Sequence, residues 1–153
     1  MERLVKEAIE NHLEHNNLIK PSQHGFRHGR SPQTNLIEFM EQTTEWADGG
    51  KSFDIIFLDF AKAFDVVCHA SLLVKHKAKG IEGDLLAWIE DWLKGRKQRV
   101  VVEGEVSESE DVVSGVVQGS ALGGTFFIIF IDDIRVPLEE ICRRYEDGAA
   151  CRE

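Results

Sequence analysis

The sequence predicts an α+β domain, because amphipathic helical segments alternate with a few short runs of β-forming residues. The 153 residues suit one ordinary domain, and neither an internal repeat nor a linker divides them. Two of the β-forming runs surround Gly104 as the strands of a hairpin would. Together these observations favour a small, mostly antiparallel sheet packed on helices and formed by residues 1–153.

Two helices are predicted in the first third of the chain. Residues 2–15 carry apolar side chains at helical spacing. After a polar loop, Ser31 is a good N-cap and Pro32 suits the first turn, so a second helix should begin there. Gly49 and Gly50 predict its end.

The middle of the chain predicts a strand, two helices and the hairpin. Residues 53–60, FDIIFLDF, form a continuous apolar run dense in β-formers, which is typical of a buried strand. Residues 70–80 and 83–95 are helical segments that each close near a glycine. Residues 97–115 hold the two strand-like runs, and a glycine-rich turn follows them.

Charge and hydropathy limit the class of protein. A net charge of −9 argues against a protein that simply coats nucleic acid, which would be basic. It leaves room for an enzyme that handles nucleic acid through metal ions. No apolar run approaches the roughly 20 residues of a membrane span, and the N-terminus lacks the apolar core of a signal peptide. We therefore expect no membrane, an intracellular setting in the nucleus or cytoplasm, and free thiols at Cys68, Cys142 and Cys151.

Four segments, in order, resemble successive blocks of the reverse transcriptase domain of non-LTR (LINE-type) retrotransposons. They are residues 21–36, 57–73, 92–127 and 143–148. The resemblance implies a right-hand polymerase fold, of which the chain would carry fingers and palm with the thumb missing. It also implies an RNA-directed DNA polymerase that uses an RNA template, a DNA primer and dNTPs, with endonuclease and thumb regions in a longer parent protein.

Two alternatives remain at this point. The chain could be a catalytically inactive, truncated or degenerate fragment that acts at most as a nucleic-acid-binding module. It could also be an unrelated metal-dependent α+β domain, if the order of the four blocks were accidental.

The resemblance implies that Asp59 and Asp147 are the catalytic carboxylates and hold Mg²⁺, for which Mn²⁺ can substitute. Asp59 ends the predicted strand, where a carboxylate can be held rigidly at the edge of a cleft; the alternative is a cap on a short helix at 61–64. The family has tyrosine–any–aspartate–aspartate at the second position, and here Gly148 replaces the last carboxylate. Glu146 would point to the opposite strand face from Asp147, so it cannot substitute.

Six residues would contact the nucleotide by the same resemblance. They are Arg27, Arg30, Phe60, Phe64, Gln118 and Gly119. The arginines suit phosphate oxygens, and the aromatic ring of Phe64 would lie under the sugar and exclude a 2′-hydroxyl, unless it is simply a core residue. Gln118 and Gly119 would lie beneath the nucleotide and template base. Val117 and Gly124 stand where the family usually has proline.

Two charged groups complete the expectations. The basic run would contact nucleic-acid phosphates, although such a run can also be a solvated face; its residues are Lys94, Arg96, Lys97 and Arg99. Asp132 and Asp133 end the apolar run 125–134. Since the family's glycine-rich turn opens a helix, this run should be that helix, with solvated or turn-forming aspartates at its C-terminal end. A strand remains the alternative because β-branched and aromatic residues dominate it.

Overall fold

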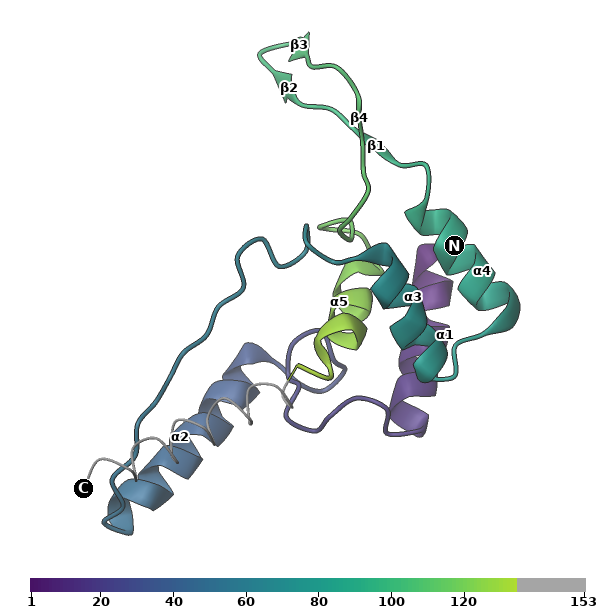
Figure 1. Ribbon diagram of the computed structural model, residues 1–153. Coiled ribbons are helices and arrows are strands. Elements are labelled where there is room, and N and C mark those ends of the chain that lie inside the picture. The colour runs from purple at the N-terminus through teal and green to yellow at the C-terminus, as the bar shows by residue number, and fades with distance from the viewer. Residues whose placement is uncertain (135–153) are drawn as a thin grey trace, which may run out of the picture.

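The computed structural model describes residues 1–134, which form five helices and four short strands. In chain order these are α1 (Glu2–His15), α2 (Pro32–Asp48), α3 (His69–Ala78), α4 (Gly83–Leu93), β1 (Lys97–Gln98), β2 (Val101–Val102), β3 (Glu105–Val106), β4 (Glu110–Asp111) and α5 (Gly123–Ile131). Figure 1 shows α1, α3, α4 and α5 gathered together, with α2 and the four strands projecting from them in different directions. The α+β class and all five helices are confirmed.

The hydrophobic core lies among α1, α3, α4 and α5. It contains Ile9 and Leu13 from α1, Leu72 from α3, Ile89 from α4 and Phe126 from α5, none more than 2% exposed. Six of the nine residues of α5 are buried. A helix that is apolar on all sides belongs in a protein interior, so the strand alternative for this run is wrong.

The hairpin around Gly104 is confirmed, but it is not part of a sheet packed on helices. β1 pairs antiparallel with β4, and β2 with β3. Glu103 and Gly104 both have positive φ, at 52° and 90°, as a tight two-residue hairpin turn requires. Every strand residue is exposed. Val101 faces Val106 but Val102 faces Glu105, so neither face of the ribbon is apolar enough to bury.

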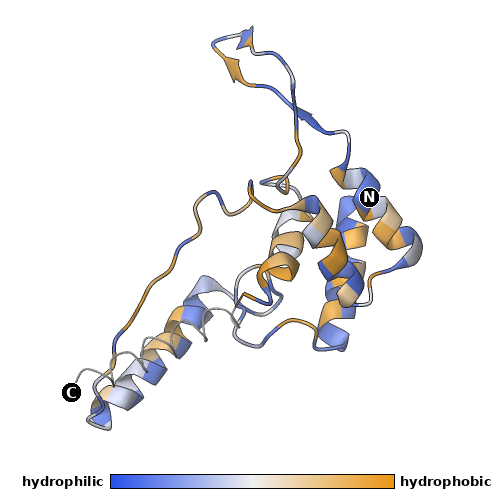
Figure 2. Ribbon diagram, viewed as in Figure 1, coloured by the Kyte–Doolittle hydropathy of each residue, from blue (hydrophilic) through white to orange (hydrophobic). Residues whose placement is uncertain are grey.

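The predicted buried strand at residues 53–60 is wrong: this segment is extended, exposed and unpaired within the described part of the chain. Phe57 is 81% exposed and Leu58 68%. A strand is stable only when a neighbour satisfies its backbone N–H and C=O groups, and no described residue pairs with it. It returns from the far end of α2 as an apolar stretch (Figure 2), with Phe39–Phe57 and Trp46–Phe53 ring contacts at 5.9 and 5.4 Å.

The helix α2 begins at the predicted N-cap, Ser31. The Ser31 side chain accepts a hydrogen bond from the Thr34 N–H at 3.2 Å, and the Thr34 side chain accepts one from the Ser31 N–H at 2.9 Å. This reciprocal pair satisfies two backbone donors at the helix start. α2 has no buried residue, so its stability depends strongly on such local bonds. None of the helices within residues 1–134 has the length and apolar character to cross a membrane.

Candidate functional site

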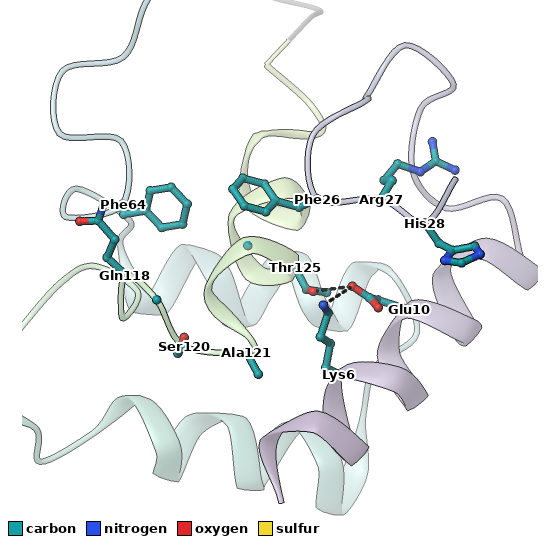
Figure 3. A pocket seen from close by; sticks show the side chains of 12 residues that line it. Lys6, Glu10, Phe26, Arg27, His28, Phe64, Gln118, Ser120, Ala121 and Thr125 are labelled. Carbon is teal, nitrogen blue, oxygen red and sulfur yellow. Dashed lines mark hydrogen bonds and ion pairs between the residues drawn. The ribbon is translucent and has the colours of Figure 1, made fainter. Parts of the chain in front are cut away.

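A pocket of about 660 Å³ opens where the loop before α2 meets the start of α5. It is lined by Lys6, Glu10, Phe26, Arg27, His28, Phe64, Gln118, Gly119, Ser120, Ala121, Gly124 and Thr125 (Figure 3). The structure therefore brings together four of the six predicted substrate residues, Arg27, Phe64, Gln118 and Gly119, from three separate segments. The other two, Arg30 and Phe60, lie outside this pocket.

The glycine-rich turn that carries Gln118 is held from both ends. At its start, Gly115 has φ +87°, its N–H donates to the Val67 carbonyl at 2.8 Å, and a Cβ there would lie 2.9 Å from the Asp65 carbonyl oxygen. At its end, the Ser120 hydroxyl donates to the Val117 carbonyl at 2.8 Å and accepts the Gly123 N–H at 3.0 Å. Gln118 and Gly119 are exposed between these anchors, so they are available to a ligand.

Phe64 is a wall of the pocket and also part of the core. Its ring stacks on Phe127 with centroids 4.8 Å apart and planes 20° apart. Phe26 meets it edge-on, at 5.8 Å and 81°. Phe64 is half-buried and packs against the core cluster. The two interpretations of this residue are therefore compatible, because the packing on Phe127 holds the ring still while it faces the pocket.

Arg27 is tied to α1 by its guanidinium group. Its Nε and Nη2 atoms donate to the two carboxylate oxygens of Glu14, at 2.9 and 2.7 Å, and Nη1 donates to the Lys20 carbonyl at 2.9 Å. The side chain is 11% exposed. This hydrogen-bonded cation holds the pKa of Glu14 below its usual value. Arg27 thus braces the loop against α1, and Glu14 balances its charge.

Arg30 lies beside a buried histidine. Its Nη1 atom is 3.2 Å from Nε2 of His24. His24 also bonds to the Thr34 hydroxyl and to Glu38, both at 2.8 Å. The arginine is therefore placed at the junction of the loop and α2 and not at the pocket wall.

Asp59 lies on the exposed segment before α3, outside the pocket. Its Oδ1 atom accepts the N–H of Phe60 at 2.9 Å, and no helix forms at 61–64 for it to cap. The Phe60 ring meets Phe127 edge-on at 6.3 Å. Asp147 lies outside the described residues. Within residues 1–134 no group of three or more His, Cys, Asp or Glu side chains could hold a metal ion, so the metal site stays a prediction.

The four residues of the basic run have different surroundings. Lys94 pairs with Glu90, and Lys97 with Asp111 at 3.3 Å, while Arg99 is exposed. Arg96 is committed to the fold: it donates to the carbonyls of Gly115 (2.8 Å) and Leu93 (3.3 Å) and lies 5.3 Å from the Trp92 ring centroid. Burial lowers the pKa of its guanidinium. Contact of this run with nucleic acid remains a prediction.

Asp132 and Asp133 follow α5 in a turn, as predicted, but Asp132 is not solvated. Its carboxylate accepts from Lys79 Nζ at 2.7 Å and from the Lys20 N–H at 3.0 Å, and its side chain is 13% exposed. Asp133 pairs with Lys75 at 2.5 Å, and this bond lowers the pKa of Asp133. Lys75 of α3 and Lys79, the residue after α3, place ammonium groups at the end of α5, and the loop after α1 adds the backbone N–H of Lys20.

Sequence reasoning missed the pocket residues that come from α1 and α5. The Thr125 hydroxyl donates to Glu10 at 2.9 Å, and Lys6 lies 3.6 Å from the same carboxylate (Figure 3). Lys6 and Glu10 are neighbours on α1 at i, i+4 spacing, but only the packing of α5 against α1 brings Thr125 to them, so no local signal could have found their place in the pocket. Phe26 is different, since it stands beside Arg27 in a segment that carries the resemblance.

Comparisons with known proteins identify the family. The family described as "Reverse transcriptase (RNA-dependent DNA polymerase)" matches residues 1–150. Among curated proteins, the chain is 34% identical over 137 residues to the RNA-directed DNA polymerase from mobile element jockey of Drosophila funebris, and 33% over 150 residues to that of Drosophila melanogaster. It is 29% identical over 136 residues to the probable RNA-directed DNA polymerase from transposon X-element of Drosophila melanogaster. No solved structure gives a significant match.

The chain belongs to the reverse transcriptase family, and the resemblance to the enzymes of non-LTR retrotransposons is confirmed. The unrelated α+β domain is thereby excluded. The three matches cover 88–92% of this chain but only 14–16% of the length of the relatives.

Proposed function

We propose that the chain supplies fingers and palm regions of an RNA-directed DNA polymerase and that its pocket receives the incoming dNTP. The observation that carries the proposal is the convergence of Arg27, Phe64, Gln118 and Gly119 on one pocket. These residues come from three of the segments that carry the resemblance. The RNA template, the DNA primer, and the endonuclease and thumb regions of a longer parent protein are the partners that this function requires.

Each of these pocket residues would contact a different part of the nucleotide. Phe64 lies under the sugar, where a ring held by Phe127 leaves no space for a 2′-hydroxyl. Gln118 offers an amide donor and acceptor, and Gly119 lets the ligand approach the backbone, since no atom of residues 1–134 outside its own chain neighbours lies within 4 Å of the position that a Cβ would take. Arg27 neutralises phosphate charge at the pocket edge once part of the Arg27 guanidinium group has left the carboxylate of Glu14.

Mg²⁺ fits the donor chemistry of Asp59 and Asp147. Magnesium prefers oxygen ligands and is commonly held by one or two carboxylates with water and substrate phosphates. Asp59 is exposed, and among residues 1–134 its carboxylate accepts the Phe60 N–H on Oδ1, so that Oδ2 is available to an ion. When bound, the metal would activate the primer 3′-hydroxyl and stabilise the leaving pyrophosphate.

Nucleotide titration tests the assignment of the pocket. We expect the 153-residue chain to bind a dNTP in the presence of Mg²⁺, and Gln118→Ala to weaken binding about 5- to 20-fold through loss of one or two hydrogen bonds. Gln42→Ala, at an exposed glutamine of α2, is the matched control and should bind as the wild-type chain does. Equal binding by the two variants would remove Gln118 from the site.

Mn²⁺ titration tests the metal site. Mn²⁺ shares the oxygen preference of Mg²⁺ and binds more tightly. Gly148→Asp should tighten Mn²⁺ binding by restoring a carboxylate beside Asp147, and Asp59→Ala should abolish the gain. Two residues that act on one ion are non-additive. Independent effects of the two substitutions would mean that Asp59 and position 148 share no metal.

A further inference from the structure

Phe26 is an exposed aromatic residue with an unusually restricted position. Its backbone has φ 55°, in the left-handed region that residues with large side chains seldom adopt. The residue is nevertheless 56% exposed. An exposed apolar side chain would ordinarily be free to change rotamer, so the contacts that hold this one need an explanation.

The ring of Phe26 packs directly against the backbone of Gly124, and this contact is called the seat of the ring. A Cβ atom at position 124 would lie 2.4 Å from Cδ1, 2.8 Å from Cγ and 3.0 Å from Cε1 of Phe26. These distances are far inside van der Waals contact, so any other residue at this position would displace the ring. The absence of a side chain at the start of α5 therefore decides where Phe26 lies.

Phe26 ends a row of aromatic rings that leads from the core to the pocket. Phe127 is buried in α5, Phe64 stacks on it, and Phe26 meets Phe64 edge-on. Figure 3 shows the rings of Phe26 and Phe64 beside each other at the pocket, with Gln118 next to Phe64. Contact with Phe64 and contact with Gly124 together fix the orientation of the Phe26 ring.

We propose that Phe26 is a nucleobase-stacking residue of the pocket and that Gly124 is its positioning residue. An aromatic ring held in place before binding loses little conformational entropy when a base stacks on it, and stacking tolerates any base. The inference rests on the proposed function, because it concerns the same pocket. The base can come from a free nucleotide or from a single-stranded template, and the chemistry of the contact is the same.

Binding of paired ligands to the full 153-residue chain separates the base from the phosphates. The probes are dATP, inorganic tripolyphosphate, a short single-stranded oligoadenylate RNA and an abasic RNA of the same length. Phe26→Leu keeps an apolar side chain but removes the ring. We expect it to weaken binding of dATP, of the oligoadenylate, or of both by about 5- to 100-fold, with tripolyphosphate and abasic RNA unchanged. Phe26→Trp should retain the base-dependent affinity.

Gly124→Ala tests whether Gly124 positions the Phe26 ring, and its control lies in the loop that carries Phe26. It should weaken the same base-bearing ligand as Phe26→Leu, and should add nothing in the Phe26→Leu background, since both substitutions remove one interaction. Gly25→Ala is the matched control, because among residues 1–134 a Cβ at Gly25 would meet only the end of the Gln23 side chain, at 3.4 Å. It should leave all four affinities unchanged.

The outcomes distinguish the inference from the proposed function. A loss with dATP alone assigns the stacked base to the nucleotide, and a loss with oligoadenylate alone assigns it to the template. A wild-type chain that binds tripolyphosphate as tightly as dATP, and abasic RNA as tightly as oligoadenylate, overturns the stacking role while the phosphate site survives. Equal losses for all four ligands overturn it too. A wild-type chain that binds none of them overturns the proposed function, and the stacking role with it.

Discussion

At the scale of single residues, His76 shows how burial sets the charge state of a side chain. It is fully buried in α3, its Nδ1 atom bonds to the Leu72 carbonyl at 2.8 Å, and its ring meets Phe126 edge-on at 4.8 Å. Its Nε2 atom has no hydrogen-bond partner among the described residues. Burial lowers the pKa of His76 to about 4. The histidine is therefore a neutral core residue and not a catalytic base.

This pKa predicts a loss of stability in mild acid. Because the folded pKa lies below the unfolded value of about 6.5, the unfolded chain binds the extra proton first, and stability falls as the pH drops from about 6.5 to about 4. The full loss from this group is on the order of 3 kcal/mol. Urea unfolding between pH 7.5 and 4.5 measures most of this loss.

His76→Phe supplies the control for the pH dependence. The variant has no titrating group in the core, so its unfolding free energy should change less across the same pH interval. If both proteins lose stability in parallel, the acid sensitivity comes from other groups.

At the scale of elements, Arg96 joins the hairpin to the turn that carries Gln118. It precedes β1, accepts the Val112 N–H on its carbonyl at 2.9 Å, and donates to the Gly115 carbonyl. His69, at the start of α3, also bonds to the Gly115 carbonyl, at 2.8 Å. Two side chains from different elements thus hold one carbonyl at the start of the turn. The pocket depends on this arrangement, although Arg96 does not line it.

Replacing Arg96 should destabilise the domain. Arg96→Met keeps much of the side-chain length and loses the hydrogen bonds to Gly115 and Leu93, so we expect a cost of about 1–3 kcal/mol in unfolding free energy. Arg99→Met, at an exposed arginine of the same hairpin, should change it by less than about 0.5 kcal/mol. Urea denaturation of both variants provides the comparison. Similar stabilities would refute a structural role for Arg96.

At the scale of the whole molecule, Asp132 connects three parts of the chain. At the end of α5, its carboxylate accepts hydrogen bonds from Lys79 Nζ, just after α3, and from the backbone N–H of Lys20 in the loop after α1. Lys79 also donates to the Leu18 carbonyl at 2.6 Å. The side chains of Lys79 and Asp132 are only 15% and 13% exposed, so their interaction is weakly screened by solvent.

Removing the charge of Asp132 should therefore cost more than removing that of its neighbour. Asp132→Asn leaves the Lys79 ammonium without its carboxylate and should lower the unfolding free energy by about 1–3 kcal/mol. Asp133→Asn affects a pair whose aspartate is 69% exposed, and should cost less than about 1 kcal/mol. Thermal or urea unfolding compares them. An equally small effect of both substitutions would contradict the connecting role of Asp132.

A further prediction concerns the polymerase activity of the whole chain. We expect the purified 153-residue protein to show little or no extension of a DNA primer on an RNA template with Mg²⁺. Gly148 removes one carboxylate of the predicted metal site, and Asp59 lies on an exposed segment that pairs with no strand among residues 1–134. A radiolabelled or fluorescent primer measures the extension. Robust synthesis by the unmodified chain would refute this prediction.

The sequence by itself determined several local elements of this protein and its family. Helical spacing predicted α1, the cap at Ser31 predicted where α2 begins, and the glycine at 104 predicted the hairpin turn. The ordered motifs predicted the family and selected four residues that now lie on one pocket. These features depend on residues that are close in sequence, or on motif order, and both can be read without a fold.

Only the tertiary structure decided the rest. The strand predicted at 53–60 failed because β-forming residues need a paired neighbour, and none lies among residues 1–134. The partners of Asp132, the seat of Phe26 on Gly124, and the structural commitment of Arg96 all join segments far apart in the chain. Side-chain type gives the capacity for a bond, but the partner that satisfies it is chosen by how the helices pack.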